Sequence, residues 1–243
     1  MPLQLLPLGD QAVLVQFGTA IQTETHERVK QLSAYLEKHP LPGMVEYIPA
    51  YTTVAVFYDA VQVYEQQKWN TTAGEILPAF EWVCRRIREI VSHLGSSVAS
   101  EGRIVEIPVC YGKEMGPDLG DVARHHGISE EEVISIHAGG EYLVYMIGFA
   151  PGFPYIGGMS PKIATPRRTS PRLKIPAGSV GIAGQQTGIY PMETPGGWQI
   201  IGRTPLKLFL PQQDPPSLLR AGDQVRFVPI TLEEYFAYEE GRG

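Results

Sequence analysis

Positive charge gathers in one stretch of this sequence. Between Pro151 and Pro205, six residues are lysine or arginine and one, Glu193, is acidic, so the local formal charge is +5 in a chain whose net charge is −6. Arginine presents a planar fork that matches carboxylate or phosphate, and lysine supplies a compact point charge. The stretch therefore predicts an anion site. Its predicted members are Arg167, Arg168 and Arg172, which bind a substrate or phosphate group, and Lys174, which acts in catalysis. For each cation taken alone, a solvated surface charge is the alternative.

Neutral hydrogen-bonding groups and aromatic rings follow these cations along the chain. An amide-like ligand needs both donors and acceptors, and small-molecule sites combine such groups with apolar walls. We expect four of these residues to contact the substrate, namely Gln186, Tyr190, Thr194 and Trp198. Gln185, beside them, is a candidate for catalysis.

Histidines offer one candidate for acid–base chemistry and no metal site. His137 lies shortly before an apolar strand that leads into the Gly/Pro-rich region, so we expect it to serve as the acid or base. His125 and His126 are adjacent, and neighbouring positions on a helix point about 100° apart. They have no acidic or thiol partner at a recognisable ligand spacing, so the sequence predicts no bound metal. Ser179 lacks the flanking glycines of a nucleophile elbow, and no other nucleophile stands out.

A loop rich in glycine and proline precedes the cations. Glycine permits close backbone approach, and each X-Pro step favours an extended conformation. The loop lacks the lysine of a phosphate-binding loop. We expect a ligand-binding loop formed by Gly148, Phe149, Pro151, Gly152 and Phe153. A rigid corner of a barrel is the alternative.

Bulk composition excludes several classes of protein. The chain has 243 residues, of which 43% are hydrophobic, and two cysteines. It has no apolar run of the roughly 20 residues needed to cross a bilayer and no basic leader, so we expect a soluble, cytoplasmic protein without a membrane partner. Residues 122–134 resemble a helix-turn-helix, but five acids and one arginine between residues 118 and 137 would repel phosphate, so nucleic acid is not an expected partner.

Two domains are expected to position these residues. Residues 1–94 predict an α+β sandwich with the order β-α-β-β-α, from strands at 12–17, 44–48 and 53–58 and helices at 23–38 and 78–94. Residues 95–102 are small and polar and predict a linker. Residues 103–243 predict a mainly-β barrel domain with short helices at 117–126 and 130–138 and a C-terminal helix at 231–240. Its expected strands lie at 103–109, 142–147, 179–183, 198–201, 206–210 and 224–228.

Several long motifs resemble one known family. The motifs include Tyr111-Gly-Lys-Glu-Met-Gly-Pro-Asp-Leu, Ile147-Gly-Phe-Ala-Pro-Gly-Phe-Pro-Tyr-Ile-Gly-Gly and Pro195-Gly-Gly-Trp-Gln-Ile-Ile-Gly-Arg-Thr. They are similar to the KipI/PxpB family, called allophanate hydrolase subunit 1 in older naming, and the likeness covers nearly the whole chain. Lys113 departs from the family, where a second glycine often follows Tyr-Gly.

The resemblance implies a fold and an activity that composition does not show. It implies a cyclophilin-like barrel in the second domain. It also implies the PxpB subunit of an ATP-dependent 5-oxoprolinase, which opens 5-oxoproline to L-glutamate together with a PxpA-like and a KipA/PxpC-like partner. ATP with Mg²⁺ would act at the level of the complex, with no cofactor held tightly by this chain. The alternative is a KipI-type inhibitor of sporulation histidine kinase autophosphorylation, which binds the kinase dimerisation domain and is antagonised by a KipA-like partner.

Overall fold

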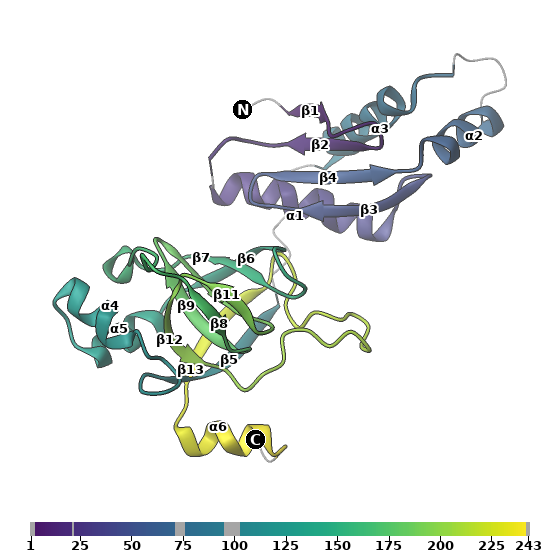
Figure 1. Cartoon of the computed structure of the whole chain (residues 1–243). Coiled ribbons are helices and arrows are strands. Elements are labelled where there is room, and N and C mark those ends of the chain that lie inside the picture. Colours follow the sequence, from purple (N-terminus) through teal and green to yellow (C-terminus); the bar gives the residue numbers. More distant parts are fainter. Residues whose placement is uncertain (1–2, 21, 71–75, 95–102, 242–243) are drawn as a thin grey trace. The chain divides into compact units, whose positions relative to one another are not determined.

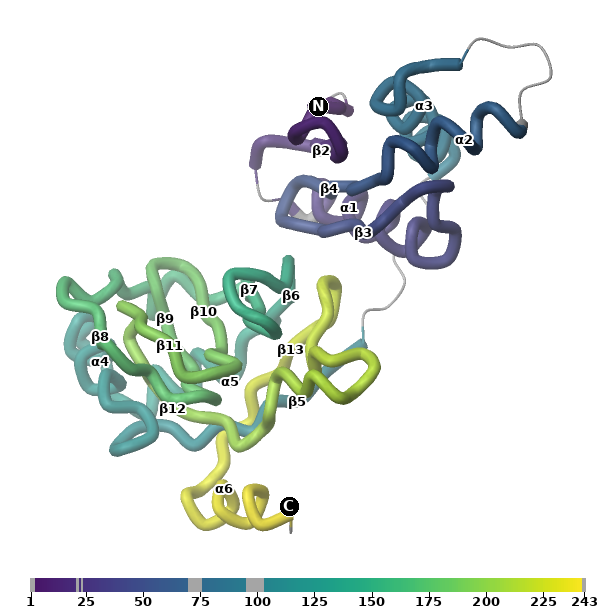
Figure 2. Tube along the Cα trace, turned by 45° about the vertical axis from the view of Figure 1, so that its right-hand side comes forward, coloured from purple at the N-terminus to yellow at the C-terminus, as the bar shows by residue number. Residues whose placement is uncertain are grey.

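The chain forms two compact units, residues 1–101 and 102–243 (Figures 1 and 2). The computed structural model describes residues 3–20, 22–70, 76–94 and 103–241. The predicted linker at 95–102 lies outside these described residues.

A four-stranded antiparallel sheet forms the centre of the first unit. Its strand order is β1-β2-β4-β3, with bounds β1 Gln4–Pro7, β2 Ala12–Gln16, β3 Met44–Pro49 and β4 Thr53–Tyr58. Buried and half-buried residues alternate along β4, as expected for a sheet with one face in a core. The predicted strands at 44–48 and 53–58 are β3 and β4, whereas β1 was not predicted.

Three helices accompany this sheet: α1 Thr23–Lys38, α2 Ala60–Asn70 and α3 Ala79–His93. Leu32 of α1 and Ile87 of α3 belong to the same core cluster as Val54 and Val56 of β4, so α1 and α3 cover the same face of the sheet. The sequence did not predict α2, whose two fully buried positions are Val63 and Gln67. The buried Gln67 carboxamide accepts a hydrogen bond from the Leu77 N–H at 2.9 Å and donates one to the Leu77 carbonyl at 3.0 Å.

A closed barrel of seven strands lies at the centre of the second unit, which confirms that a barrel was correctly predicted (Figure 1). The order around the barrel is β10-β7-β6-β13-β5-β12-β9. The bounds are β5 Ile104–Tyr111, β6 Tyr142–Ile147, β7 Pro154–Gly157, β9 Ser179–Ala183, β10 Gln186–Ile189, β12 Gln199–Arg203 and β13 Gln224–Pro229. Among the strand pairs of the described residues, only β5 and β13 run parallel, from Ile104 beside Gln224 to Val109 beside Pro229. Side chains such as Val109, Val144 and Ile182 fill the interior with Phe227.

Elements outside the barrel carry much of the predicted polar chemistry. Strands β8 (Arg172–Ile175) and β11 (Thr194–Gly196) form a separate two-stranded sheet. Helices α4 (Leu119–His126) and α5 (Glu130–Ala138) pack together, and a 3₁₀ turn, η1, spans Pro161–Ile163. A capping box starts α5: Ser129 Oγ accepts from the Glu132 N–H, and Glu132 accepts from the Ser129 N–H.

One predicted strand is wrong. Residues 206–210 form a loop, with a single isolated bridge between Phe209 and Ser217. Proline occupies both flanks, at positions 205 and 211, and the loop folds back so that the Leu210 N–H donates to the Pro216 carbonyl at 2.7 Å. The predicted C-terminal helix is α6, Leu232–Glu239, which starts at a second capping box made by Thr231 and Glu234. Within the described ranges, no helix combines the length and the apolar character needed to cross a membrane.

Candidate functional site

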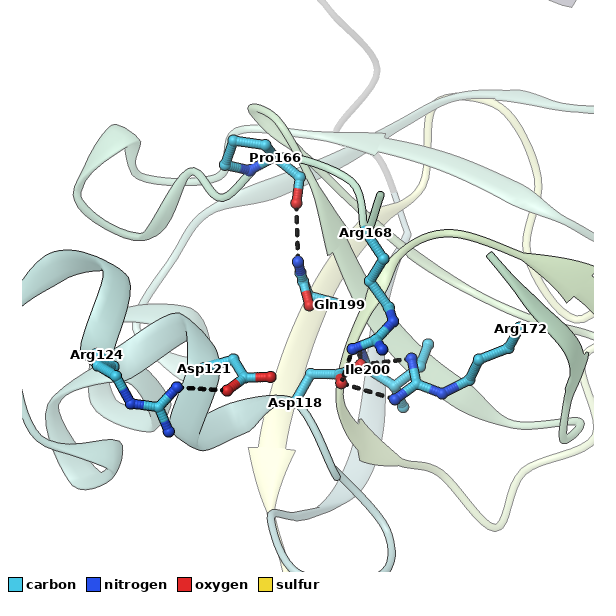
Figure 3. A network of polar contacts seen from close by, with 8 residues as sticks. All are labelled: Asp118, Asp121, Arg124, Pro166, Arg168, Arg172, Gln199 and Ile200. Atoms are coloured by element: carbon cyan, nitrogen blue, oxygen red, sulfur yellow. Dashed lines mark hydrogen bonds and ion pairs between the residues drawn. The ribbon is translucent and has the colours of Figure 1, made fainter. Parts of the chain in front are cut away.

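A buried carboxylate, that of Asp118, holds two of the predicted anion-binding arginines (Figure 3). Arg172 makes a two-point contact, from Nη1 to Oδ2 at 2.8 Å and from Nη2 to Oδ1 at 2.7 Å. Arg168 donates from Nη1 to Oδ1 at 2.9 Å, and the Ile200 N–H donates to Oδ2 at 2.6 Å. Asp118 is only 1% exposed. We call Asp118, Arg168 and Arg172 the Asp118 clamp.

Tight backbone packing brings Asp118 to this position. The segment that precedes α4 runs beside β12: the Gly112 N–H donates to the Ile201 carbonyl at 3.0 Å, and the Asp118 N–H donates to the Ile200 carbonyl at 2.9 Å. A Cβ atom added at Gly116 would lie 2.0 Å from the Ile201 carbonyl oxygen. Only glycine fits at 116, so this residue lets the segment approach the strand closely enough to form the clamp.

The clamp changes the electrostatics expected from the sequence. One carboxylate balances one of two guanidinium groups, so one formal positive charge remains in excess. Hydrogen bonding to Asp118 raises the pKa of Arg172, which keeps this guanidinium charged. Lys174 Nζ lies 3.2 Å from Glu193 Oε1 in a pair whose side chains are 78% and 55% exposed. The cation-rich stretch thus finds counter-ions within the chain, and its excess charge is smaller than the sequence indicated.

Two further contacts draw the predicted binding residues together. The Arg167 guanidinium carbon lies 6.0 Å from the centroid of the Trp198 ring, within the range of a cation–π interaction. The Arg168 N–H donates to the Gly197 carbonyl at 2.7 Å. Because β8 pairs with β11, Gly196 also lies opposite Arg172. The structure therefore gathers the three predicted arginines beside the 195–198 turn.

The predicted binding loop connects β6 to β7 and is only partly available to a ligand. The Gly148 N–H donates to the Phe153 carbonyl at 3.0 Å, and Phe153 is 3% exposed. Gly152 has a φ of +76°, and a Cβ there would lie 2.9 Å from Phe209 Cβ. Phe149, by contrast, is 72% exposed and has a φ of +69°, a left-handed conformation that bulky residues rarely adopt. Pro151 is exposed beside it.

Phe153 is the centre of an aromatic cluster. Its ring centroid lies 5.2 to 5.8 Å from four other rings, all edge-to-face. These rings belong to Phe149, Tyr155, Tyr190 and Trp198. Tyr190 is 2% exposed, and burial raises the pKa of its hydroxyl to about 12. Phe153 and Tyr190 are therefore core residues that support the loop, while Phe149 is presented to solvent.

His137 lies inside the barrel unit, where its ring nitrogens are fully used. The Thr187 hydroxyl donates to the Gly181 carbonyl at 3.1 Å, so its oxygen accepts from His137 Nε2–H at 2.9 Å. His137 Nδ1 then accepts from the Tyr111 hydroxyl at 2.8 Å. The ring stacks on Phe227, with centroids 4.4 Å apart.

Burial fixes this histidine in its neutral form. His137 is 0% exposed, and burial lowers its pKa to about 3. It has no surface on which to meet a substrate. The expectation that His137 acts as an acid or base is therefore corrected: it is a core residue that joins α5 to the barrel strands.

The remaining predicted residues lie on β10, on β11 and in the turn that precedes β10. Gln185 is exposed in the turn between β9 and β10, and the adjacent Gly184 N–H donates to the Thr165 carbonyl at 2.8 Å. This contact places the turn beside the segment that leads to Arg167. Gln186 is half-buried, and Thr194 has a buried hydroxyl with no hydrogen-bond partner in the described part of the chain. Their roles with a ligand remain predictions.

Sequence reasoning missed two residues, Asp118 and Gln199. Gln199 Nε2 donates to the Pro166 carbonyl at 2.9 Å, and its Oε1 is buried with no partner among residues that the structure describes. Asp118 did carry a signal, because it ends a Gly-Pro-Asp step directly before a helix. Its partners are 50 and 54 residues away, a pairing that one sequence does not reveal. Across the described residues, no three His, Cys, Asp or Glu side chains are grouped so as to hold a metal ion.

Comparison with known proteins assigns the chain to a family. Residues 3–219 match the family model described as carboxyltransferase domain, subdomain C and D. The chain belongs to this family. Two relatives of this carboxyltransferase-domain protein are each named as the B subunit of 5-oxoprolinase. The one from Bacillus subtilis (strain 168) is 53% identical over 237 residues, which cover 98% of this chain and 97% of that protein. The one from Escherichia coli O157:H7 is 42% identical over 222 residues, or 91% of this chain and 94% of that protein.

A solved structure also resembles this carboxyltransferase-domain protein in fold and in sequence. The protein TTHA0988 superposes with a TM-score of 0.75 at 33% identity over 90% of the chain. The chain spans 40% of that longer protein. Together with the two relatives, the family match confirms the resemblance to the KipI/PxpB family that the motifs indicated.

Proposed function

We propose that this chain is the PxpB subunit of an ATP-dependent 5-oxoprolinase, which opens 5-oxoproline to L-glutamate. The observation that carries the proposal is 53% identity, along nearly the full length of both chains, to a protein named as the B subunit of 5-oxoprolinase. Such a subunit works with other subunits, and we take these to be a PxpA-like and a KipA/PxpC-like partner. We expect the complex in the cytoplasm and the barrel to be of the cyclophilin-like type.

The site geometry supports a role in binding and orienting a small anionic amide. The Asp118 clamp carries one positive charge in excess, which suits the carboxylate of 5-oxoproline. Thr194 and Gln199 supply hydrogen-bonding groups close to it in the chain fold, and we propose that Gln185 and Gln186 also contact the ring amide. His137 is withdrawn into the core, so we assign this chain no proton transfer through it. ATP and Mg²⁺ are taken to act at the level of the complex.

Kinase inhibition, the alternative function, is not favoured. The relatives that match along nearly the whole chain carry the oxoprolinase name. The surroundings of the clamp also suit a small ligand, with buried polar atoms and a fixed guanidinium pair.

Reconstitution tests the proposal. The chain is mixed with its PxpA-like and PxpC-like partners, and glutamate formation from 5-oxoproline is measured with and without ATP. We expect glutamate only when all three subunits and ATP are present. Full activity of the two partners without this chain, or no activity of the complete mixture, would overturn the assignment.

A further inference from the structure

The two arginines of the Asp118 clamp are used differently. Arg172 donates hydrogen bonds to Asp118 from both of its Nη atoms. Arg168 donates to Asp118 from Nη1 alone. Its Nε is buried, and neither Nε nor Nη2 has a hydrogen-bond partner in the part of the chain that the structure describes. Arg168 therefore keeps Nη2 free, while Nη1 is held by Asp118 and Nε is covered by the protein.

That free nitrogen has a defined chemistry. Nη2 carries two N–H donors and a share of the guanidinium charge, so it can donate a charge-assisted hydrogen bond to a carboxylate oxygen. Nε, by contrast, is buried and is covered by the protein. The Arg168 side chain is 31% exposed, whereas that of Asp118 is 2% exposed and is closed to a ligand.

We propose that Asp118 is a positioning residue that holds Arg168 so that its Nη2 binds the carboxylate of the substrate. The inference rests on the proposed function, because 5-oxoproline is the ligand that brings the carboxylate. Asp118 itself does not touch the substrate. Arg172 anchors Asp118 from the other side, and the Ile200 N–H fixes the second carboxylate oxygen.

The proposal predicts which kinetic constant responds. The carboxylate of 5-oxoproline is unchanged by ring opening, so its contact with Arg168 is equally strong before and during the reaction. Loss of such uniform binding raises KM and leaves kcat nearly unchanged. A variant that merely disturbed the fold would lower the amount of active complex and hence the apparent kcat.

The test uses the complex reconstituted from its three subunits, with Arg168→Lys, Asp118→Asn and a control, Asp121→Asn. Asp121 forms an exposed pair with Arg124 at 2.7 Å on the same helix and lies outside the clamp. We expect Arg168→Lys and Asp118→Asn to raise KM for 5-oxoproline at least tenfold with kcat within threefold of the wild type. The Asp121→Asn complex should keep both constants. 2-Pyrrolidinone, the same ring without the carboxylate, should inhibit the wild type and all variants with the same inhibition constant.

A second readout does not depend on activity. Limited trypsin digestion of the isolated chain cuts after Arg168 and Arg172 once their side chains are released. Asp118→Asn should be cut there at least fivefold faster than Asp121→Asn. A KM that stays within twofold in Arg168→Lys would overturn the carboxylate contact, and unchanged cleavage in Asp118→Asn would overturn the positioning role. If the wild-type complex forms no glutamate, the proposed function fails, while the cleavage rates still decide whether Asp118 positions the arginines.

Discussion

Buried polar residues of this chain are of two kinds. In the first kind every polar side-chain atom has a hydrogen-bond partner, and in the second kind at least one atom has none. Asp118 and His137 are of the first kind, since each accepting or donating atom of the side chain has a partner. Arg168, Thr194 and Gln199 are of the second kind, within the described residues. His137 is also closed to solvent, whereas Arg168 has an unpaired Nη2 among the described residues and a side chain that is 31% exposed. The candidate site therefore lies at the clamp and not at His137.

Burial of neutral His137 predicts a pH-dependent stability. Its pKa falls from 6.5 to about 3 on folding, so the unfolded chain binds the proton more tightly. The contribution is complete above pH 6.5 and is lost as the pH falls from 6.5 toward 3, at about 1.4 kcal/mol for each pH unit. His137→Gln should be less stable than the wild type at pH 7, and the difference should shrink between pH 6.5 and 5. Urea unfolding at each pH measures this.

The matched control for this prediction is His93→Gln, at an exposed helix end. It should keep the pH dependence of the wild type. His26, whose pKa burial lowers to about 4, titrates in the wild type and in both variants and therefore cancels from the comparison. A gap between wild type and His137→Gln that stays constant down to pH 5 would contradict the buried neutral state.

At the scale of elements, the β6–β7 loop presents Phe149 in a strained conformation. A left-handed φ costs a non-glycine residue roughly 1–2 kcal/mol. Phe149→Ala and Phe149→Gly lose the same contact with Phe153, but only glycine is free of the strain. Phe149→Gly should therefore be more stable than Phe149→Ala by about 1 kcal/mol in urea unfolding. At exposed Leu173 of β8, the order should be reversed, with alanine the more stable.

The segment before α4 depends on glycine in a different way. Gly116→Ala should cost on the order of 3 kcal/mol or more, because the backbone of β12 lies where the new methyl group would sit. Gly127, which ends α4 with a φ of +66°, has open space around it, so Gly127→Ala should cost only about 1 kcal/mol. Urea unfolding of the two variants gives the comparison. Equal costs would show that the segment has room to move away from Ile201.

These elements also show where sequence reasoning succeeds and where it stops. Residues 53–58 and 142–147 are apolar, aromatic or β-branched over a full strand length, so β4 and β6 were predicted with the observed bounds. Strands β8, β10 and β11 have three or four residues and contain glycine or sit beside proline, which leaves no periodicity to detect. The cations of the site were visible as residues. Their counter-ion Asp118 was not, because the fold alone brings it across 50 residues of chain.

At the scale of the whole molecule, each unit has a core of its own. The cluster around Val54, Leu32 and Ile87 draws only on residues of the first unit. The cluster around Val109 and Phe227, and the aromatic cluster of Phe153, draw only on the second. A domain with its own hydrophobic core is expected to fold by itself.

Separate expression of residues 1–94 and 103–243 tests this independence. We expect both fragments to give cooperative thermal unfolding and dispersed amide NMR spectra, because each keeps its complete core. The rate of glutamate formation with both fragments and the partner subunits, compared with the rate for the intact chain, shows whether the reaction needs the two units to be joined in one chain. A fragment that is unfolded alone but ordered in the full chain would contradict independent folding.

The parallel pairing of β5 with β13 sets the order in which a newly made chain can mature. β5 is the first barrel strand to be synthesised and β13 the last, yet β13 lies between β5 and β6. Until residues 224–229 leave the ribosome, β5 and β6 each have an open edge, and the inner faces around Val109 and Val144 lack their cover. A stop codon between β12 and β13, at positions 204–223, should therefore leave an open sheet that is prone to aggregate, because all the barrel strands except β13 have then been made.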